Sequence, residues 1–161
     1  MMTNAFSCMA MLEDEAYQLY VLWKERVGDP QIRLLLNLVL KQTQTHGELL
    51  NELSQYSGND TSSSVEDCGK ELGTLFTRAL ELTRSVEQDV LAGLPIDQVA
   101  RKLLEVEDAT NEEYVSEILA RARADLIEKD PAVKRILESI AKDEAEHVEI
   151  LKLILELTAS Q

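Results

Sequence analysis

The stretch Glu144-Ala145-Glu146-His147 places a carboxylate and an imidazole one helical turn apart, in a chain that contains only two histidines. The other histidine, His46, lies 101 residues earlier, and Thr43 stands where Glu144 stands in the later copy. Each copy follows an Asp-Pro pair at the same distance, Asp29-Pro30 in the first and Asp130-Pro131 in the second. The chain therefore carries a duplicated helix with one histidine at the same place in each copy.

Two acidic stretches upstream of the histidines also echo each other. Glu13-Asp14 is followed by Tyr20-Val21, and Glu107-Asp108 is followed by Tyr114-Val115 at the same spacing. A glutamate on one helix and a histidine on its partner, given twice, is how a four-helix bundle builds a two-metal site in its core. The glutamates and histidines of both halves are therefore candidate metal ligands.

The composition favours a single all-helical domain over residues 1–161. Glycine (6), proline (3) and aromatic residues (4%) are scarce. A β-sandwich or barrel needs more turn residues than this composition provides. The chain is also long enough for one sizeable core but too short for two comfortable ones.

Periodicity and helix start and stop signals predict five helices. Gly28 follows the end of the first helix, and an aspartate cap with proline in the first turn opens the second and the fifth. Ser63 and Glu66 form a capping-box pattern that opens the third helix after a polar linker over 57–64. The expected helices cover roughly 7–27, 30–56, 65–93, 95–128 and 131–158.

Helical periodicity places both histidines at the centres of apolar stripes. Glu13, Glu107 and Glu144 also fall on the inward faces of their helices. Burying one unpaired carboxylate costs several kcal/mol, which is comparable with a domain's whole stability of roughly 5–15 kcal/mol. Three inward carboxylates beside two imidazoles therefore predict a bound cation, and this oxygen and nitrogen donor set suits iron or manganese.

Charge and cysteine content exclude several classes of partner and site. The net charge of −14 disfavours binding to nucleic acid or to an anionic membrane. Cys8 and Cys68 form no CxxC pair, which excludes a rubredoxin-type iron site and a zinc knuckle, because both need four ligands. A single disulfide is one option, but two cysteines favour a reducing compartment. Lacking a basic N-terminal region and a long apolar run, the chain is expected to be soluble and cytoplasmic.

These motifs resemble the ferritin-like superfamily, most closely its rubrerythrin-type members without a rubredoxin domain. The resemblance covers all of the chain except the crossover. It implies an antiparallel four-helix bundle of two helix pairs, joined by a crossover over 57–95 that contains an extra helix. That helix could pack outside the bundle or form a dimer contact. The residues that carry the resemblance are Glu13, Ala16, Tyr20, His46, Glu107, Tyr114 and Glu144-Ala145-Glu146-His147.

The same resemblance implies two bound metal ions, first of all iron, with manganese or zinc as alternatives. Tyr20 and Tyr114 would lie beside the ligands, hydrogen-bonding to them and passing electrons or protons. An ordinary core role is the alternative for both tyrosines. The implied ligands are two terminal carboxylates, one bridging carboxylate and one imidazole per ion: Glu13 and Glu107, Glu144, and His46 and His147.

Two departures from the family pattern affect the site. The family's second bridging glutamate, three residues before the first histidine, is Thr43 here, so one metal position is poorer in ligands and a single fully formed position is the alternative. Gln42, Gln44 and Glu48 lie nearby, but none sits as well on the inward face.

The second departure is the spacing of the fourth helix. Glu107 lies about two helical turns, or roughly 10 Å, further from the following turn than the duplication requires. A longer loop or a helix irregularity would absorb the excess. Glu113 is the alternative ligand on this helix.

Three functions are compatible with these motifs. The first is a rubrerythrin-like dinuclear iron, or iron–manganese, oxidoreductase that reacts with peroxide or oxygen and receives electrons from a separate donor. The second is an iron-binding or storage protein of the ferritin type. The third is a bundle with a degenerate site that serves as a structural or interaction module, which Thr43 favours. A homodimer is expected for a bundle of this type.

Overall fold

The computed structural model describes residues 5–58, 63–110 and 129–161, and these residues are all-α. They form six helices and no strand, which confirms the expected fold class at the level of a helical bundle. The helices are α1 (Ala5–Arg26), α2 (Pro30–Tyr56), α3 (Val65–Leu72), α4 (Thr74–Leu91), α5 (Ile96–Thr110) and α8 (Pro131–Ala159).

The helices that carry the two histidines begin where the sequence predicts. Asp29 caps α2 by accepting hydrogen bonds from the backbone N–H groups of Gln31 and Ile32, at 2.8 and 3.2 Å. Asp130 caps α8 in the same way, at 3.0 and 3.2 Å. A proline in the first turn of each helix lacks the N–H group that would otherwise need a partner.

The expectation of one continuous helix over 65–93 is wrong. Gly73 adopts a φ of 67°, a conformation that favours glycine, and divides α3 from α4. The helix cap also differs from the expected pair of Ser63 and Glu66. Ser64 instead accepts a hydrogen bond from the N–H of Asp67 at 3.0 Å. The crossover therefore contains a short helix, a sharp turn and a long helix.

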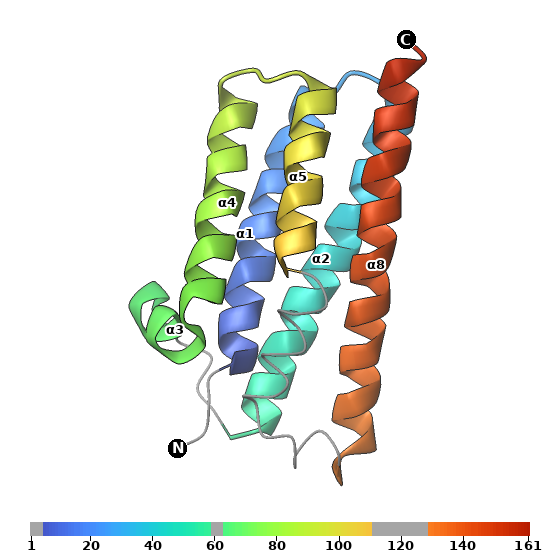
Figure 1. Cartoon of the computed structure of the whole chain (residues 1–161). Coiled ribbons are helices and arrows are strands. Elements are labelled where there is room, and N and C mark those ends of the chain that lie inside the picture. The colour runs from blue at the N-terminus through green and yellow to red at the C-terminus, as the bar shows by residue number, and fades with distance from the viewer. Residues whose placement is uncertain (1–4, 59–62, 111–128) are drawn as a thin grey trace.

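The long crossover helix α4 carries the chain back along the bundle. Figure 1 shows α1, α4 and α8 running in one direction, and α2 and α5 in the opposite direction. α4 packs against both α1 and α5. It buries an apolar face that includes Phe76, Leu80, Val86 and Val90. α4 is therefore part of the bundle core rather than an external addition.

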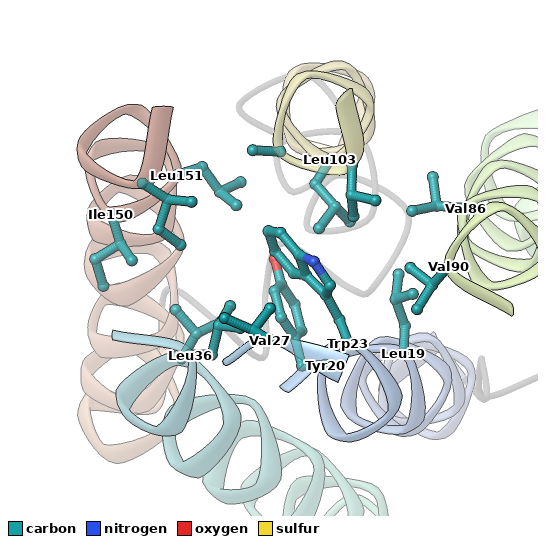
Figure 2. Close-up of a cluster of buried hydrophobic side chains, with 14 of the residues drawn as sticks. Leu19, Tyr20, Trp23, Val27, Leu36, Val86, Val90, Leu103, Ile150 and Leu151 are labelled. Carbon is teal, nitrogen blue, oxygen red and sulfur yellow. The ribbon is translucent and has the colours of Figure 1, made fainter. Parts of the chain in front are cut away.

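Two apolar clusters fill the core on either side of the candidate ligands. The first includes Met9 of α1, Leu50 of α2 and Ile140 of α8. The second gathers around Tyr20 and Trp23 of α1, with side chains from α2, α4, α5 and α8 (Figure 2). Since the candidate ligands on α1, α2 and α8 fall between members of the two clusters, they form a polar layer inside an apolar core.

The two cysteines pair with each other. Cys8 of α1 and Cys68 of α3 are both buried and form a disulfide. This bond attaches the start of the crossover to α1. None of the helices in the described ranges is long and apolar enough to cross a membrane.

The place of α4 in the core predicts the effect of a substitution. Phe76→Ala should lower the free energy of unfolding by about 3–5 kcal/mol, because the side chain is fully buried. Arg78→Ala, at an exposed position of the same helix, should change it by less than about 0.5 kcal/mol. Equilibrium denaturant unfolding measures both values. Equally small effects would contradict the inclusion of α4 in the core.

Candidate metal centre

Five predicted ligands from four helices come together in the polar layer. α1 contributes Glu13, α2 contributes His46, α5 contributes Glu107, and α8 contributes both Glu144 and His147. They form two groups, one of Glu13, His46 and Glu144 and the other of Glu107, Glu144 and His147. Within each group the potential ligand atoms lie within 4.8 Å of one another. The arrangement is therefore two adjacent candidate metal-binding groups that share the Glu144 carboxylate.

Close packing of α1 on α2 holds part of this cluster. Both histidines are 1% exposed, whereas the side chains of Glu13 and Glu144 are 18% and 20% exposed. Gly47 follows His46 and faces α1. A methyl group at Gly47 would lie 3.1 Å from Oδ1 of Asp14 and 3.7 Å from Cβ of Glu13. The absence of a side chain there leaves room for the Asp14 carboxylate against α2.

His46 lies among three carboxylates. Its Nδ1 atom is 3.2 Å from Oε1 of Glu144 and 3.7 Å from Oε2 of Glu13. Its Nε2 atom is 2.9 Å from Oδ2 of Asp143. One ring nitrogen therefore faces the candidate ligands, while the other is held by a carboxylate outside the two groups.

His147 repeats this arrangement with a different outer partner. Its Nδ1 atom is 3.5 Å from Oε2 of Glu144, and its Nε2 atom is 3.0 Å from Oε1 of Gln42. Gln42 in turn donates a hydrogen bond from Nε2 to Oε2 of Glu146 at 3.2 Å. The planes of the two imidazole rings are inclined by 29°, and their centroids lie 5.9 Å apart. Glu144 thus offers one oxygen to each histidine.

Tyr20 lies beside the cluster. Its hydroxyl donates a hydrogen bond to Oε1 of Glu107 at 3.5 Å. This contact places Glu107, the preferred ligand of the fourth predicted helix, in the cluster. Tyr114, the alternative ligand Glu113 and the predicted spacing irregularity lie outside the described residues.

Thr43, the counterpart of Glu144 in the duplication, belongs to neither of the two groups. It is 2% exposed, and its hydroxyl donates a hydrogen bond to the carbonyl of Val39 at 2.8 Å. Beside it lies a cavity of about 80 Å³. The cavity is lined by carboxylates, His147 and Tyr20, and also by apolar side chains of α1, α4, α5 and α8. Open space therefore lies next to the cluster beside Thr43.

The outer partners Asp143 and Gln42 are functional candidates that the helical stripes do not reveal. Asp143 is the 101-residue counterpart of Gln42, and each lies four residues before the histidine of its own helix. Each contacts the histidine of the other helix. The 101-residue duplication could therefore have pointed to Asp143 and Gln42. Their contacts with the histidines, however, depend on how α2 packs against α8.

In the metal-free cluster, protons occupy several of the candidate ligands. Burial, followed by the charge of Glu144, raises the pKa of Glu13 to about 8. The same two causes raise the pKa of Glu107 well above its usual range. Burial alone would lower the pKa of His46, but hydrogen bonds with Glu13 and Glu144 raise it to about 10. A cation that binds here must therefore displace protons.

The ionised group of the cluster is Glu144. Burial opposes its ionisation, but hydrogen bonds with His147 and His46 hold its pKa well below the usual range. Burial, and then the charge of Glu107, raise the pKa of Tyr20 well above its usual range. The phenol therefore stays protonated and acts as the donor to Glu107.

These shifts predict an unusual pH dependence for the metal-free protein. A group whose pKa is higher in the folded than in the unfolded protein stabilises the folded state. This stabilisation is fully present below the pKa of the unfolded state and is lost as the pH rises through the pKa of the folded state. For Glu13 this loss runs from pH 4.5 to about 8, and for His46 from 6.5 to about 10. The melting temperature of the protein, measured in the presence of a chelator, should therefore decrease by about 5 °C or more as the pH rises from 6 to 9. A flat or rising curve over this interval would contradict the assignment.

Zn(II) provides the matched comparison in the same experiment. Because bound ligands are deprotonated, the rise in melting temperature caused by Zn(II) should grow from pH 6 to pH 8. In Glu13→Gln without metal, the fall in melting temperature should be smaller than in the wild type. Differential scanning calorimetry measures all three curves.

Comparisons with known families, curated proteins and solved structures found no match to this chain. Evidence about its function therefore comes from the residues and their geometry.

Proposed function

We propose that this protein binds two divalent metal ions, most simply iron, and reduces peroxide or oxygen at them in the manner of rubrerythrin-type members of the ferritin-like superfamily. The observation that carries the proposal is that two Glu/His groups share the Glu144 carboxylate. A shared carboxylate holds two ions close together, as two-metal chemistry requires.

The donor set fits this group of metals. Each position offers two carboxylates and one imidazole, which suit iron, manganese or zinc better than a thiolate-preferring ion. Glu13 and Glu107 would be the outer carboxylates, and Glu144 would bridge. Bound cations would also compensate the carboxylates that the fold buries. The charge of the cluster supports cation binding even though Thr43 replaces a fourth carboxylate.

The surroundings of the cluster support a small oxidant. The cavity of about 80 Å³ beside Thr43 has room for a few water-sized molecules, since a water occupies about 30 Å³ in the liquid. Most of its wall is apolar. Tyr20 keeps its proton, donates to Glu107 and lines this cavity, so it can hold a proton at the cavity wall.

Held by these residues, two ferrous ions would supply the two electrons that, together with two protons, convert one peroxide to two waters. A separate protein or small-molecule donor would return the two electrons. We further propose a homodimer as the working assembly.

Peroxide consumption tests this function. Anaerobically loaded Fe(II) protein should consume about one peroxide for each two Fe(II) oxidised, faster than the same concentration of free Fe(II). His147→Ala should lose this acceleration, while Glu149→Gln, an exposed change on the same helix, should keep it. Stopped-flow absorbance and peroxide assay give both quantities. A wild-type rate equal to that of free Fe(II) would exclude the oxidoreductase.

Oligomer size separates the storage alternative from this proposal. A storage protein takes up many irons per chain into a cage, which gel filtration and iron analysis after aerobic loading would show. A small assembly with no more than two irons per chain excludes storage.

A further inference from the structure

The two histidines are held by chemically different partners, and this difference distinguishes the two candidate metal positions. His46 Nε2 lies 2.9 Å from the carboxylate of Asp143, whereas His147 Nε2 lies 3.0 Å from the amide oxygen of Gln42. Asp143 and Gln42 are equivalent in the duplication, so each half of the bundle supplies the outer partner for the other half's histidine. The two halves therefore repeat the position of the outer partner, but this partner is a carboxylate for His46 and a neutral amide for His147.

Gln42 is oriented by a further contact. Its amide nitrogen donates to Oε2 of Glu146 at 3.2 Å, which turns the amide oxygen toward His147. His147 is therefore held by a neutral acceptor. When one ring nitrogen of a histidine donates a hydrogen bond to a carboxylate, the opposite nitrogen becomes a stronger metal ligand. Losing such a carboxylate typically weakens metal binding by about 10- to 100-fold.

Other contacts also favour metal binding at the position that contains His46. Three carboxylates, those of Glu13, Glu144 and Asp143, have an oxygen within 3.7 Å of the His46 ring. The Glu144 carboxylate lies 3.2 Å from His46 Nδ1 and 3.5 Å from His147 Nδ1. At the other position, Glu107 accepts the hydrogen bond from Tyr20. This bond engages one of the Glu107 oxygens, which are potential metal ligands. More carboxylate groups therefore surround the first position.

We propose that the two positions load in order: the first ion binds to Glu13, His46 and Glu144, and the second binds more weakly to Glu107, Glu144 and His147. Asp143 and Gln42 are the positioning residues that set the difference. This inference rests on the proposed metal site, and it implies a stable state with a single ion bound. Such a state would let the protein hold two different divalent ions.

Titration with Co(II) under anaerobic conditions tests the order. Visible absorption and quenching of Trp23, the single tryptophan of the chain, report binding. Wild type should show two dissociation constants that differ by about 10- to 100-fold. His147→Ala should keep the tighter ion, and His46→Ala should keep only the weaker one.

The outer partners give the matched pair of variants. Asp143→Asn should weaken only the tighter constant by about 10- to 100-fold, and Gln42→Glu should strengthen only the weaker one. A merely structural effect would move both constants together, and thermal unfolding of each metal-free variant identifies a folding defect. Two equal constants in wild type, or a tighter ion retained in His46→Ala and lost in His147→Ala, would overturn the order.

Two other outcomes separate this inference from the proposed function. One ion per chain, retained in His147→Ala and lost in His46→Ala, would support the difference in affinity between the two positions. It would also exclude two-metal chemistry. Absence of Co(II) binding in wild type overturns both the order and the proposed metal site.

Discussion

Glu144→Gln should abolish binding of both metal ions, whereas Glu13→Gln and Glu107→Gln should each weaken one. Glu144 is the carboxylate that both candidate groups contain, and it places one oxygen near each histidine. Losing a direct ligand should weaken binding by more than the roughly 10- to 100-fold that follows loss of an outer partner.

Zinc content after equilibration and gel filtration measures this effect. Glu149→Gln is the matched control, because it makes the same chemical change at an exposed position of α8. Circular dichroism of each metal-free variant establishes that the bundle is folded. If Glu144→Gln kept one full equivalent of zinc, Glu144 would not bridge the two groups.

Thr43→Glu should have opposite effects on the metal-free and metal-loaded protein. Without metal, a further carboxylate would be buried beside Glu144, and the free energy of unfolding should fall by about 1–3 kcal/mol. With metal, the new carboxylate would reach the cluster through the neighbouring cavity. The weaker ion should then bind at least about tenfold more tightly, which corresponds to about 1.4 kcal/mol.

Thr43→Val controls for the loss of the hydroxyl, since it has the same shape and carries no charge. It loses the hydrogen bond to the Val39 carbonyl but should leave both metal affinities unchanged. Unfolding with and without Zn(II), together with competition against a chelator, gives the two energies. A Thr43→Glu protein that binds metal no better than Thr43→Val would show that position 43 does not face the ions.

Much of the fold and of the cluster could be predicted because helices impose simple periodicity. The caps at Asp29 and Asp130 depend only on neighbouring residues, so the sequence was sufficient to locate them. His46 and Glu144 fall on inward faces because a residue's angle around a helix follows from its number. Glu144, three residues before His147, could therefore be expected beside it.

Contacts between helices were harder to predict. The Asp143–His46 and Gln42–His147 contacts depend on the relative shift and rotation of α2 and α8, which no single helix encodes. The break at Gly73 is local, but a lone glycine inside an apolar pattern is often tolerated in a helix. The inner place of α4 depends on tertiary packing, because its looser apolar pattern is compatible with either location.

The iron content of the wild-type protein tests the central claim most directly. The protein is loaded with Fe(II) without oxygen, separated from free iron by gel filtration, and analysed for iron and protein. Two irons per chain are expected, since two Glu/His groups share Glu144. Iron at or below the level found in Glu144→Gln would contradict the account and leave the cluster as a proton-bearing polar layer in a helical scaffold.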